Sequence, residues 1–424
     1  MLVTYNKDVL EDKVALGANL YYIEILKLMN NLKREDIEFV PHSFREIVLG
    51  KSKLPKLKGD DVVLSNVGPY AWYYHYLREK NNLNFRIIRD VQTSLWTDYF
   101  LQEDLCRHYT RDGDSVIFLS NFNKILFMKF FPDSVRKNNS FVFNTCGLFF
   151  PQSYEKPKKE NEELVLGVLG SINRDKNFDQ ALEVFIRVYK NLGGNVKMLV
   201  AGPTGPLIYD KEIFAPKKVR QKLGKNGVNP INYQHINNGQ FLKYENIWNM
   251  LGKIDVFLFP SVSIRESFGR VLAEASYAGC KVVSSNYAAA PEILGKNNLV
   301  KVDFYKKIFN LVVSASLGKV NVDEMTEKCC NYEKLPKKYI NMYAKIENFL
   351  KILENRPVKN SVKINNEIKK YIKNITIIKP IRNNSNEKLI KILGEQLIRL
   401  AEFNRINISN FVYNIKYSVY AKIE

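Results

Sequence analysis

The feature that most constrains the fold is an alternation of strand-like and helix-like segments that stops once and then restarts. Short apolar runs at residues 61–67, 85–91 and 115–120 predict strands in the first 150 residues, and the segments between them predict helices. Residues 151–163 (PQSYEKPKKENEE) are polar and contain proline, which is typical of a linker. The alternation resumes with LVLGVLG at 164–170. Each half of the chain is therefore expected to form an α/β domain with a doubly wound parallel sheet.

The linker and a change in composition divide the chain into three parts. We predict an N-terminal doubly wound domain at residues 1–155, a C-terminal one at 156–354 and a basic, mostly helical appendage at 355–424. The appendage holds 14 Lys/Arg against 5 Asp/Glu, a net charge of +9. In sheets of this kind ligands bind at the carboxyl ends of the strands. Two such sheets whose carboxyl ends face each other would form a cleft, and we expect the ligand there.

Composition limits the class of protein further. The formal net charge of +20 predicts anionic partners, such as phosphates, an anionic membrane face or nucleic acid, or else a solvated basic surface. The five cysteines are scattered and form no C-x-x-C pair, which indicates reduced thiols in a cytoplasmic protein. No stretch approaches the roughly 20 apolar residues of a membrane span. The first residues lack the apolar core of a signal peptide.

Two glutamates, Glu266 and Glu274, lie eight positions apart around a Phe-Gly pair. A helix is expected to begin near Gly269 and to end before Gly279, which places Glu266 in a loop and Glu274 in the helix. Eight helical residues rise roughly 12 Å, so the two carboxylates cannot share one proton or one metal. They can contact the two ends of an elongated polar ligand, with an anionic group at the glycine and the helix N-terminus between them. A nucleotide sugar fits that description.

These residues resemble the signature of an enzyme family. ESFGRVLAE, followed by A-x-x-A-G-C-K-V-V, is similar to the E-x7-E signature of retaining glycosyltransferases of family 4. That family has the GT-B fold, in which two Rossmann-like domains face a cleft. The resemblance implies that Glu266, with the backbone of Phe268 and Gly269, binds donor sugar hydroxyls, and that Glu274 holds the ribose hydroxyls. The alternative is an amphipathic helix with two solvated glutamates.

Further matches to this family follow in the expected order. LGSINRDKN at 169–177 resembles G-R-x-x-x-x-K-N, which supplies two cations to the diphosphate. Lys176 takes the lysine position, Ser171 takes the arginine position, and Arg174 is a candidate to replace the arginine. Cations here would stabilise the leaving diphosphate, and a surface role for them is the alternative. The resemblance also assigns donor-site positions to Gly170, Gly202, Gly205 and His235, and Tyr332-Glu333-Lys334 resembles W-E-K near the family's C-terminus.

In the first domain the match is weaker. Gly17 lies in a segment that resembles the glycine loop after the family's first strand. FRIIRDVQT at 85–93 falls where many members have a strand that ends in His-Asp, and the pair here is Arg89-Asp90. The family's histidine contacts the donor sugar, so the resemblance implies that Arg89 takes over this contact or that the sugar differs. Packing or a surface salt bridge is the alternative for this pair.

A second sequence motif known from glycosyltransferases is interpreted here as a structural turn. Asp112-Gly113-Asp114 is a D-x-D, the metal-binding mark of the other large glycosyltransferase fold, but it precedes a strand instead of following one. A polar turn explains it better, so we expect neither an obligatory metal nor a cofactor. The alternative function is a basic nucleic-acid- or membrane-binding protein on a GT-B scaffold without transferase activity. It leaves the E-x7-E unexplained, and we do not expect nucleic acid as a partner.

The resemblance therefore implies retaining transfer of a sugar from a nucleotide sugar to a hydroxyl of an acceptor glycan or lipid-linked glycan. The protein is expected in the cytoplasm, with docking on the inner face of a membrane as one alternative for the appendage. There, Ile390, Leu393, Leu397 and Leu400 form one helical stripe beside basic residues. The stripe either docks on an anionic surface or packs on the enzyme's own body.

Overall fold

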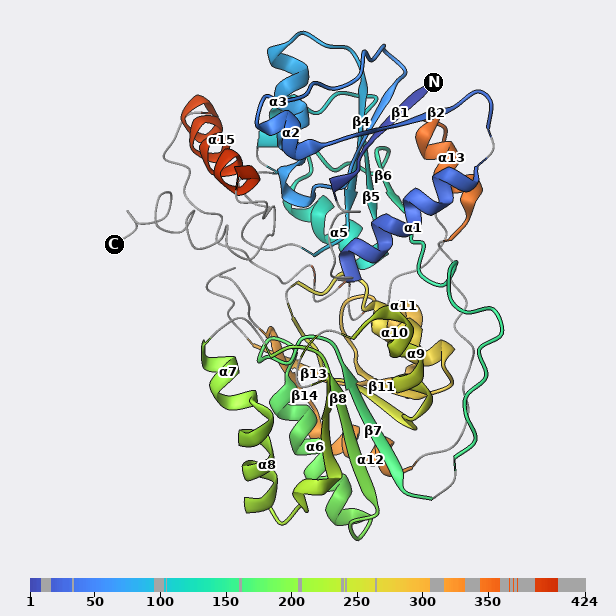
Figure 1. Cartoon of the computed structure of the whole chain (residues 1–424), viewed down its shortest axis with the longest axis vertical. Coiled ribbons are helices and arrows are strands. Elements are labelled where there is room, and N and C mark those ends of the chain that lie inside the picture. Colours follow the sequence, from blue (N-terminus) through green and yellow to red (C-terminus); the bar gives the residue numbers. More distant parts are fainter. Residues whose placement is uncertain are drawn as a thin grey trace.

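The computed structural model describes most of the chain. The described residues are 1–8, 17–32, 34–94, 103, 105–159, 162–204, 208–237, 240, 242–263, 265–305, 316–331, 344–358, 366, 369, 372 and 386–402. Their two large sheets contain six strands each, and every pair of neighbouring strands is parallel. Figure 1 shows the sheets in two domains that follow each other along the long axis.

The first sheet has the order β2-β1-β3-β4-β5-β6 and the second the order β12-β11-β10-β7-β8-β9. Buried, nearly continuous apolar strands such as VVLS in β3 and VFLF in β10 suit a parallel sheet, because helices cover both of its faces. The strands are β1 Leu2–Asn6, β2 Glu38–His42, β3 Val62–Ser65, β4 Arg86–Val91, β5 Ser115–Phe118, β6 Ser140–Val142, β7 Leu164–Leu169, β8 Val196–Ala201, β9 Tyr233–Ile236, β10 Val256–Phe259, β11 Lys281–Ser285, β12 Leu299–Val300, and an antiparallel pair, β13 Val302–Phe304 and β14 Gly318–Val320.

Helices alternate with these strands, as the sequence pattern predicts. Several begin at a capping side chain: Ser43 accepts a hydrogen bond from Glu46 N, and Ser120 accepts one from Asn123 N. The α-helices are α1 Gly17–Asn31, α2 Phe44–Val48, α3 Trp72–Lys80, α5 Asn121–Phe130, α6 Phe178–Asn191, α7 Ile208–Phe214, α8 Pro216–Lys225, α9 Tyr244–Gly252, α10 Arg270–Tyr277, α11 Ala290–Ile293, α12 Val322–Cys330, α13 Ile346–Leu353 and α15 Asn386–Glu402.

The chain returns to the first domain after the second sheet is complete. In α13, Phe349 is fully buried and stacks on Phe143, with ring centroids 4.9 Å apart. Arg86 of β4 donates a hydrogen bond to the carbonyl of Leu353 at 2.7 Å. By packing, α13 thus belongs to the first domain, although it precedes the predicted boundary at residue 354.

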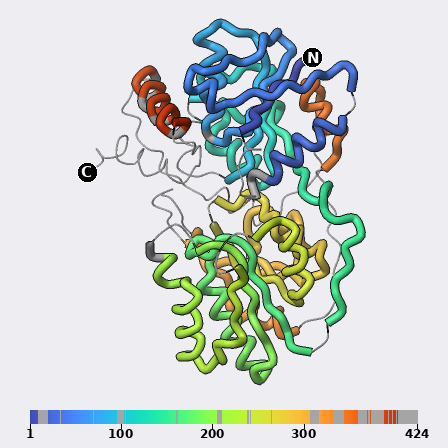
Figure 2. The backbone as a smooth tube through the Cα atoms, viewed as in Figure 1, coloured from blue at the N-terminus to red at the C-terminus, as the bar shows by residue number. Residues whose placement is uncertain are grey.

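Helix α15 also packs on the first domain, where Figure 2 shows it in red beside the blue segments. Leu393 and Leu397 are fully buried in a cluster with Phe44 and Trp72. The Arg45 guanidinium donates to the α15 carbonyl of Ala401 at 2.7 Å. The predicted stripe therefore packs on the first domain as far as it is described, and its use as a membrane anchor is not supported. The Leu400 side chain lies outside the described part.

Candidate functional site

The stretch with the two glutamates has the predicted local structure. Helix α10 begins after Gly269, whose φ of 80° lies in the left-handed region that favours glycine. A Cβ atom at this position would lie 3.0 Å from Leu272 Cδ1 and 3.8 Å from Glu266 Oε1. The prediction that Glu266 lies in the loop and Glu274 in the helix is therefore confirmed, and the glycine keeps space free beside the Glu266 carboxylate.

Glu266 and Lys176 meet although they are 90 residues apart in the chain. Lys176 Nζ donates to Glu266 Oε2, and it also lies 5.6 Å from the centroid of the Phe259 ring. The two side chains keep 32% and 11% of their exposure, for Lys176 and Glu266 respectively, so a ligand can reach the pair. A cation and a carboxylate from two distant segments of the chain are thus placed side by side.

The loop of Lys176 is held by two asparagines. Asn173 Oδ1 accepts a hydrogen bond from Lys176 N at 3.1 Å. Asn177 has a left-handed φ of 54°, and its side-chain amide donates to the carbonyl of Pro260 at 3.0 Å. This second bond ties the loop after β7 to the end of β10. Arg174 N donates to Asp210 Oδ1 at 3.3 Å in the same loop.

Two glycine loops lie against each other at the ends of β7 and β8. Gly170 and Gly202 have φ values of 129° and 126°, and a Cβ atom on Gly202 would lie 2.0 Å from Gly170 O. Only glycine permits this approach of two backbones. His235 is buried, and its Nε2 lies 2.8 Å from Gly202 O. Burial lowers the pKa of His235, so the neutral ring supports this loop. Ser171 is half-buried beside Gly170, and Gly205 lies outside the described residues.

Glu274 is 2% exposed and belongs to an ion network that the sequence did not reveal. Arg270 Nε donates to Glu274 Oε1 at 2.8 Å. The guanidinium also forms a bidentate pair with Glu24 of α1, at 2.9 and 2.7 Å. Burial raises the pKa of Glu274 above its usual value. The only signal in the sequence is an arginine one helical turn before Glu274, and nothing in it points to Glu24.

The Arg270 network joins the two domains. Its guanidinium lies over the rings of Tyr21, Phe150 and Tyr244, with the guanidinium carbon 5.2, 5.7 and 5.7 Å from their centroids. Thr145 Oγ1 donates to Glu24 Oε2 at 2.9 Å. A buried, bidentate arginine with aromatic neighbours is well suited to a stable ion pair across an interface.

The loop of Glu266 also contacts the first domain directly. Ser267 Oγ donates to Gln92 O at 2.8 Å, and Ser120 Oγ donates to Ser267 O at 2.7 Å. Phe268 is buried and meets Tyr21 edge to face, with centroids 6.2 Å apart. The Phe268 backbone and Glu266 therefore lie where the carboxyl ends of β4 and β10 face each other.

Glu292, in the segment that follows β11, makes a further contact between the domains. Its carboxylate accepts hydrogen bonds from Asn121 N at 3.1 Å and from Phe122 N at 2.9 Å. These are the first amides of α5, so the carboxylate lies at the positive end of that helix. This contact adds to those of Glu24 and Ser267.

Arg89 and Asp90 at the end of β4 have separate surroundings. Arg89 is buried and pairs with Glu103, inside the first domain. This pairing supports the packing alternative and does not support a contact between Arg89 and the donor sugar. Asp90 Oδ2 accepts from Gln92 Nε2 at 2.6 Å, whereas its buried Oδ1 has no hydrogen-bond partner. Burial raises the pKa of Asp90 to about 7.

The D-x-D is a structural turn, as predicted. Asp114 pairs with the Arg78 guanidinium at 2.7 Å and accepts a bond from Ile87 N at 2.8 Å, whereas Asp112 is fully exposed. Within the described ranges, no group of three or more His, Cys, Asp or Glu side chains could hold a metal. Gly17 is the first residue of α1, and the segment 9–16 before it and residues 332–334 lie outside the described residues.

No helix in the described part of the chain is long and apolar enough to cross a membrane. Comparison with known proteins gives a family match for most of the second domain. Residues 150–308 match the family model described as glycosyl transferases group 1. A curated relative is the GPI3 subunit of phosphatidylinositol N-acetylglucosaminyltransferase from Saccharomyces cerevisiae, which is 21% identical over 267 residues that cover 60% of this chain and 54% of the relative. This chain thus spans about half the length of the curated relatives it matches.

Solved structures also resemble this chain over most of its length. WaaG, a glycosyltransferase involved in lipopolysaccharide biosynthesis, is 14% identical, with 83% of this chain and 99% of that chain covered and a TM-score of 0.50. HepE of Anabaena, solved with UDP and glucose, is 13% identical, with 71% and 86% covered and a TM-score of 0.49. The likeness to WaaG and the two parallel sheets confirm the GT-B fold. Together with the group 1 match, the fold supports a GT-B glycosyltransferase.

Proposed function

We propose that this protein is a retaining glycosyltransferase that moves a sugar from a nucleotide sugar to an acceptor hydroxyl. The observation that carries the proposal is the pair of Lys176 and Glu266, because both residues come from motifs of the donor site and meet at the carboxyl ends of β7 and β10. Ligands of doubly wound sheets bind at such ends. The group 1 match covers both residues.

The motifs assign a role to each side chain, and the exposure of Lys176 and Glu266 supports the roles of these two. Lys176 neutralises the diphosphate that leaves, and Arg174 in the same loop is the candidate for a second cation. Glu266 binds hydroxyls of the donor sugar, with the backbone of Phe268 and Gly269 beside it. Glu274 holds the ribose through the carboxylate that Arg270 orients.

Retention follows if the acceptor attacks the face from which the diphosphate leaves. In this scheme the leaving phosphate oxygen takes the proton of the acceptor hydroxyl, so the protein need not supply a nucleophile. Its contribution is to orient the two substrates and to stabilise the charge that develops on the diphosphate. Contact between the two domains at Ser267 and Gln92 keeps water away from the reacting sugar.

The donor and acceptor are proposed from the relatives. The yeast relative is named as an N-acetylglucosaminyltransferase acting on phosphatidylinositol, so N-acetylhexosamine is the first sugar to test and a lipid-linked acceptor the first acceptor class. HepE was solved with UDP, so UDP is the first nucleotide to test. A panel of nucleotide sugars with different bases and sugars, read by thermal stabilisation, separates these choices.

The proposal is tested with Glu266→Gln. Transfer from the best donor of the panel should fall by about 10²–10³-fold, because one strong contact to the reacting sugar is weakened, whereas the melting temperature should not change. Glu183→Gln is the matched control, since Glu183 is 49% exposed and pairs with Arg187 on α6. Near-normal turnover of Glu266→Gln would remove this residue from the site. If none of the nucleotide sugars binds, the transferase proposal itself fails.

A further inference from the structure

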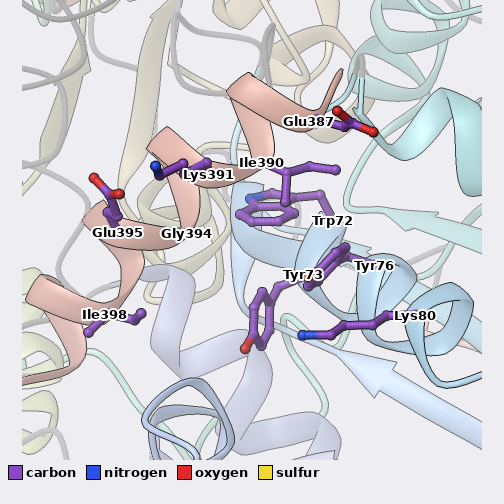
Figure 3. Close-up of a pocket in the computed structure, with 10 residues that line it drawn as sticks. All are labelled: Trp72, Tyr73, Tyr76, Lys80, Glu387, Ile390, Lys391, Gly394, Glu395 and Ile398. Atoms are coloured by element: carbon purple, nitrogen blue, oxygen red, sulfur yellow. The ribbon is translucent and has the colours of Figure 1, made fainter. Parts of the chain in front are cut away.

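A recess lies on the first domain, between α3 and α15. It has a volume of about 480 Å³. Figure 3 shows the rings of α3 on one side and α15 on the other, with Ile390 and Ile398 pointing towards the rings. We call it the α3–α15 groove, and it is lined by Trp72, Tyr73, Tyr76, Lys80, Glu387, Ile390, Lys391, Gly394, Glu395 and Ile398.

The floor of the groove is aromatic. Trp72 meets Tyr73 edge to face at 5.6 Å, and the ring centroids of Tyr73 and Tyr76 are 6.0 Å apart. Lys80 Nζ lies 5.5 Å from the centroid of the Tyr76 ring. Trp72 is fixed in the core, whereas the two tyrosines remain half-buried and accessible. Such rings present flat faces with negative potential, which attract the weakly positive C–H groups of a ligand.

The rim of the groove is charged but balanced. It carries two ammonium groups, on Lys80 and Lys391, and two carboxylates, on Glu387 and Glu395. All four side chains are exposed, and none forms an ion pair with another described residue. The two carboxylates would repel a polyanion. An alkyl chain would offer no hydrogen-bond partner to any of the four charged groups. A neutral ligand rich in hydroxyls suits this rim, because carboxylates accept from hydroxyls and ammonium groups donate to them.

A glycine in the middle of α15 is a separate sign of a ligand. Gly394 lies between Ile390 and Ile398 on the face that borders the groove. Glycine is a poor helix former, and α15 has 17 residues, so alanine would stabilise this position. A Cβ atom on Gly394 would meet nothing within 4 Å, so packing gives no reason for a glycine. Close approach of a ligand does give one.

We propose that the α3–α15 groove binds a neutral oligosaccharide, with sugar rings stacked on Tyr73 and Tyr76 and sugar hydroxyls at the charged rim. Such a ligand has apolar faces and polar edges in the arrangement that the groove requires. The groove is separate from the loop of Glu266, so it would hold a distant part of a glycan. That this glycan is the acceptor rests on the proposed function, but the binding itself does not.

The test uses the full chain on an array of neutral, sulfated and uronic oligosaccharides, followed by calorimetric titration of the neutral one that binds best. Gly394→Trp should fill the groove and weaken binding by at least about tenfold without destabilising the helix. Tyr73→Ala/Tyr76→Ala should weaken it similarly through loss of stacking. Gly295→Trp is the matched control, because its Cβ would also meet nothing within 4 Å, and it should bind as the wild type does.

Three results would overturn the inference: equal affinity of Gly394→Trp and wild type, binding of anionic oligosaccharides only, or no binding of any neutral oligosaccharide at millimolar concentration. Binding of the nucleotide sugar is measured in parallel, and it should be unchanged in Gly394→Trp. Loss of oligosaccharide binding with intact nucleotide-sugar binding supports the groove. Oligosaccharide binding without any nucleotide-sugar binding would keep the groove and refute the transferase proposal.

Discussion

Replacement of Arg270 by methionine should destabilise the protein far more than loss of an ordinary surface arginine. Arg270 pairs with Glu274 of its own helix and with Glu24 of the other domain. The side chains of Glu24 and Glu274 are 6% and 2% exposed, so Arg270→Met leaves two carboxylates buried without their cation. Removing one partner from a buried ion pair costs about 3–5 kcal/mol, because the remaining charge stays desolvated.

The measurement is the free energy of unfolding from urea titrations followed by far-ultraviolet circular dichroism. Arg187→Met is the control, since Arg187 pairs with Glu183 on α6 while 41% exposed, and pairs of this kind contribute about 0.3–0.5 kcal/mol. A triple variant, Glu24→Leu/Arg270→Met/Glu274→Leu, should regain most of the loss, because it removes all three buried charges together. A loss below about 1 kcal/mol for Arg270→Met, equal to that of the control, would refute the reasoning.

Three further predictions concern the cation, the buried aspartate and metals. Lys176→Ala should lower kcat by about 10²–10³-fold, and a full rate at saturating donor would place the diphosphate clamp elsewhere. Burial raises the pKa of Asp90 from 3.8 to about 7, so the folded protein keeps a proton that the unfolded chain releases, and stability should fall by up to about 4 kcal/mol as the pH rises through this range. In Asp90→Asn, urea titrations at about pH 4 and about pH 7 should no longer show this fall in the free energy of unfolding. An unchanged pH dependence would show that Asp90 does not cause the fall. Transfer should continue in EDTA, and complete loss that Mg²⁺ or Mn²⁺ restores would show that a metal is required.

The parts of the fold and the site that could be predicted are those that leave a pattern within a few neighbouring residues. Strand-helix alternation predicts parallel sheets because each segment shows its burial in its own few residues. The glycine before α10 likewise places Glu266 in a loop and Glu274 in a helix, as observed. The short motif at 169–177 also points to Lys176. The role of Arg89 could not be settled this way, because its partner Glu103 lies in a segment without a readable pattern.

The sequence by itself thus determined two parallel-sheet domains, a loop with Glu266 and a cationic loop with Lys176. Only the tertiary structure decided which distant side chains meet. Glu24 and Arg270 are 246 residues apart, and no local pattern connects them. The stripe of α15 is equally apolar whether it faces a membrane or a protein core, and its contacts with Phe44 and Trp72 decided for the core. Side-chain periodicity reports that a face is buried, whereas the partner that buries it is selected by the folded chain as a whole.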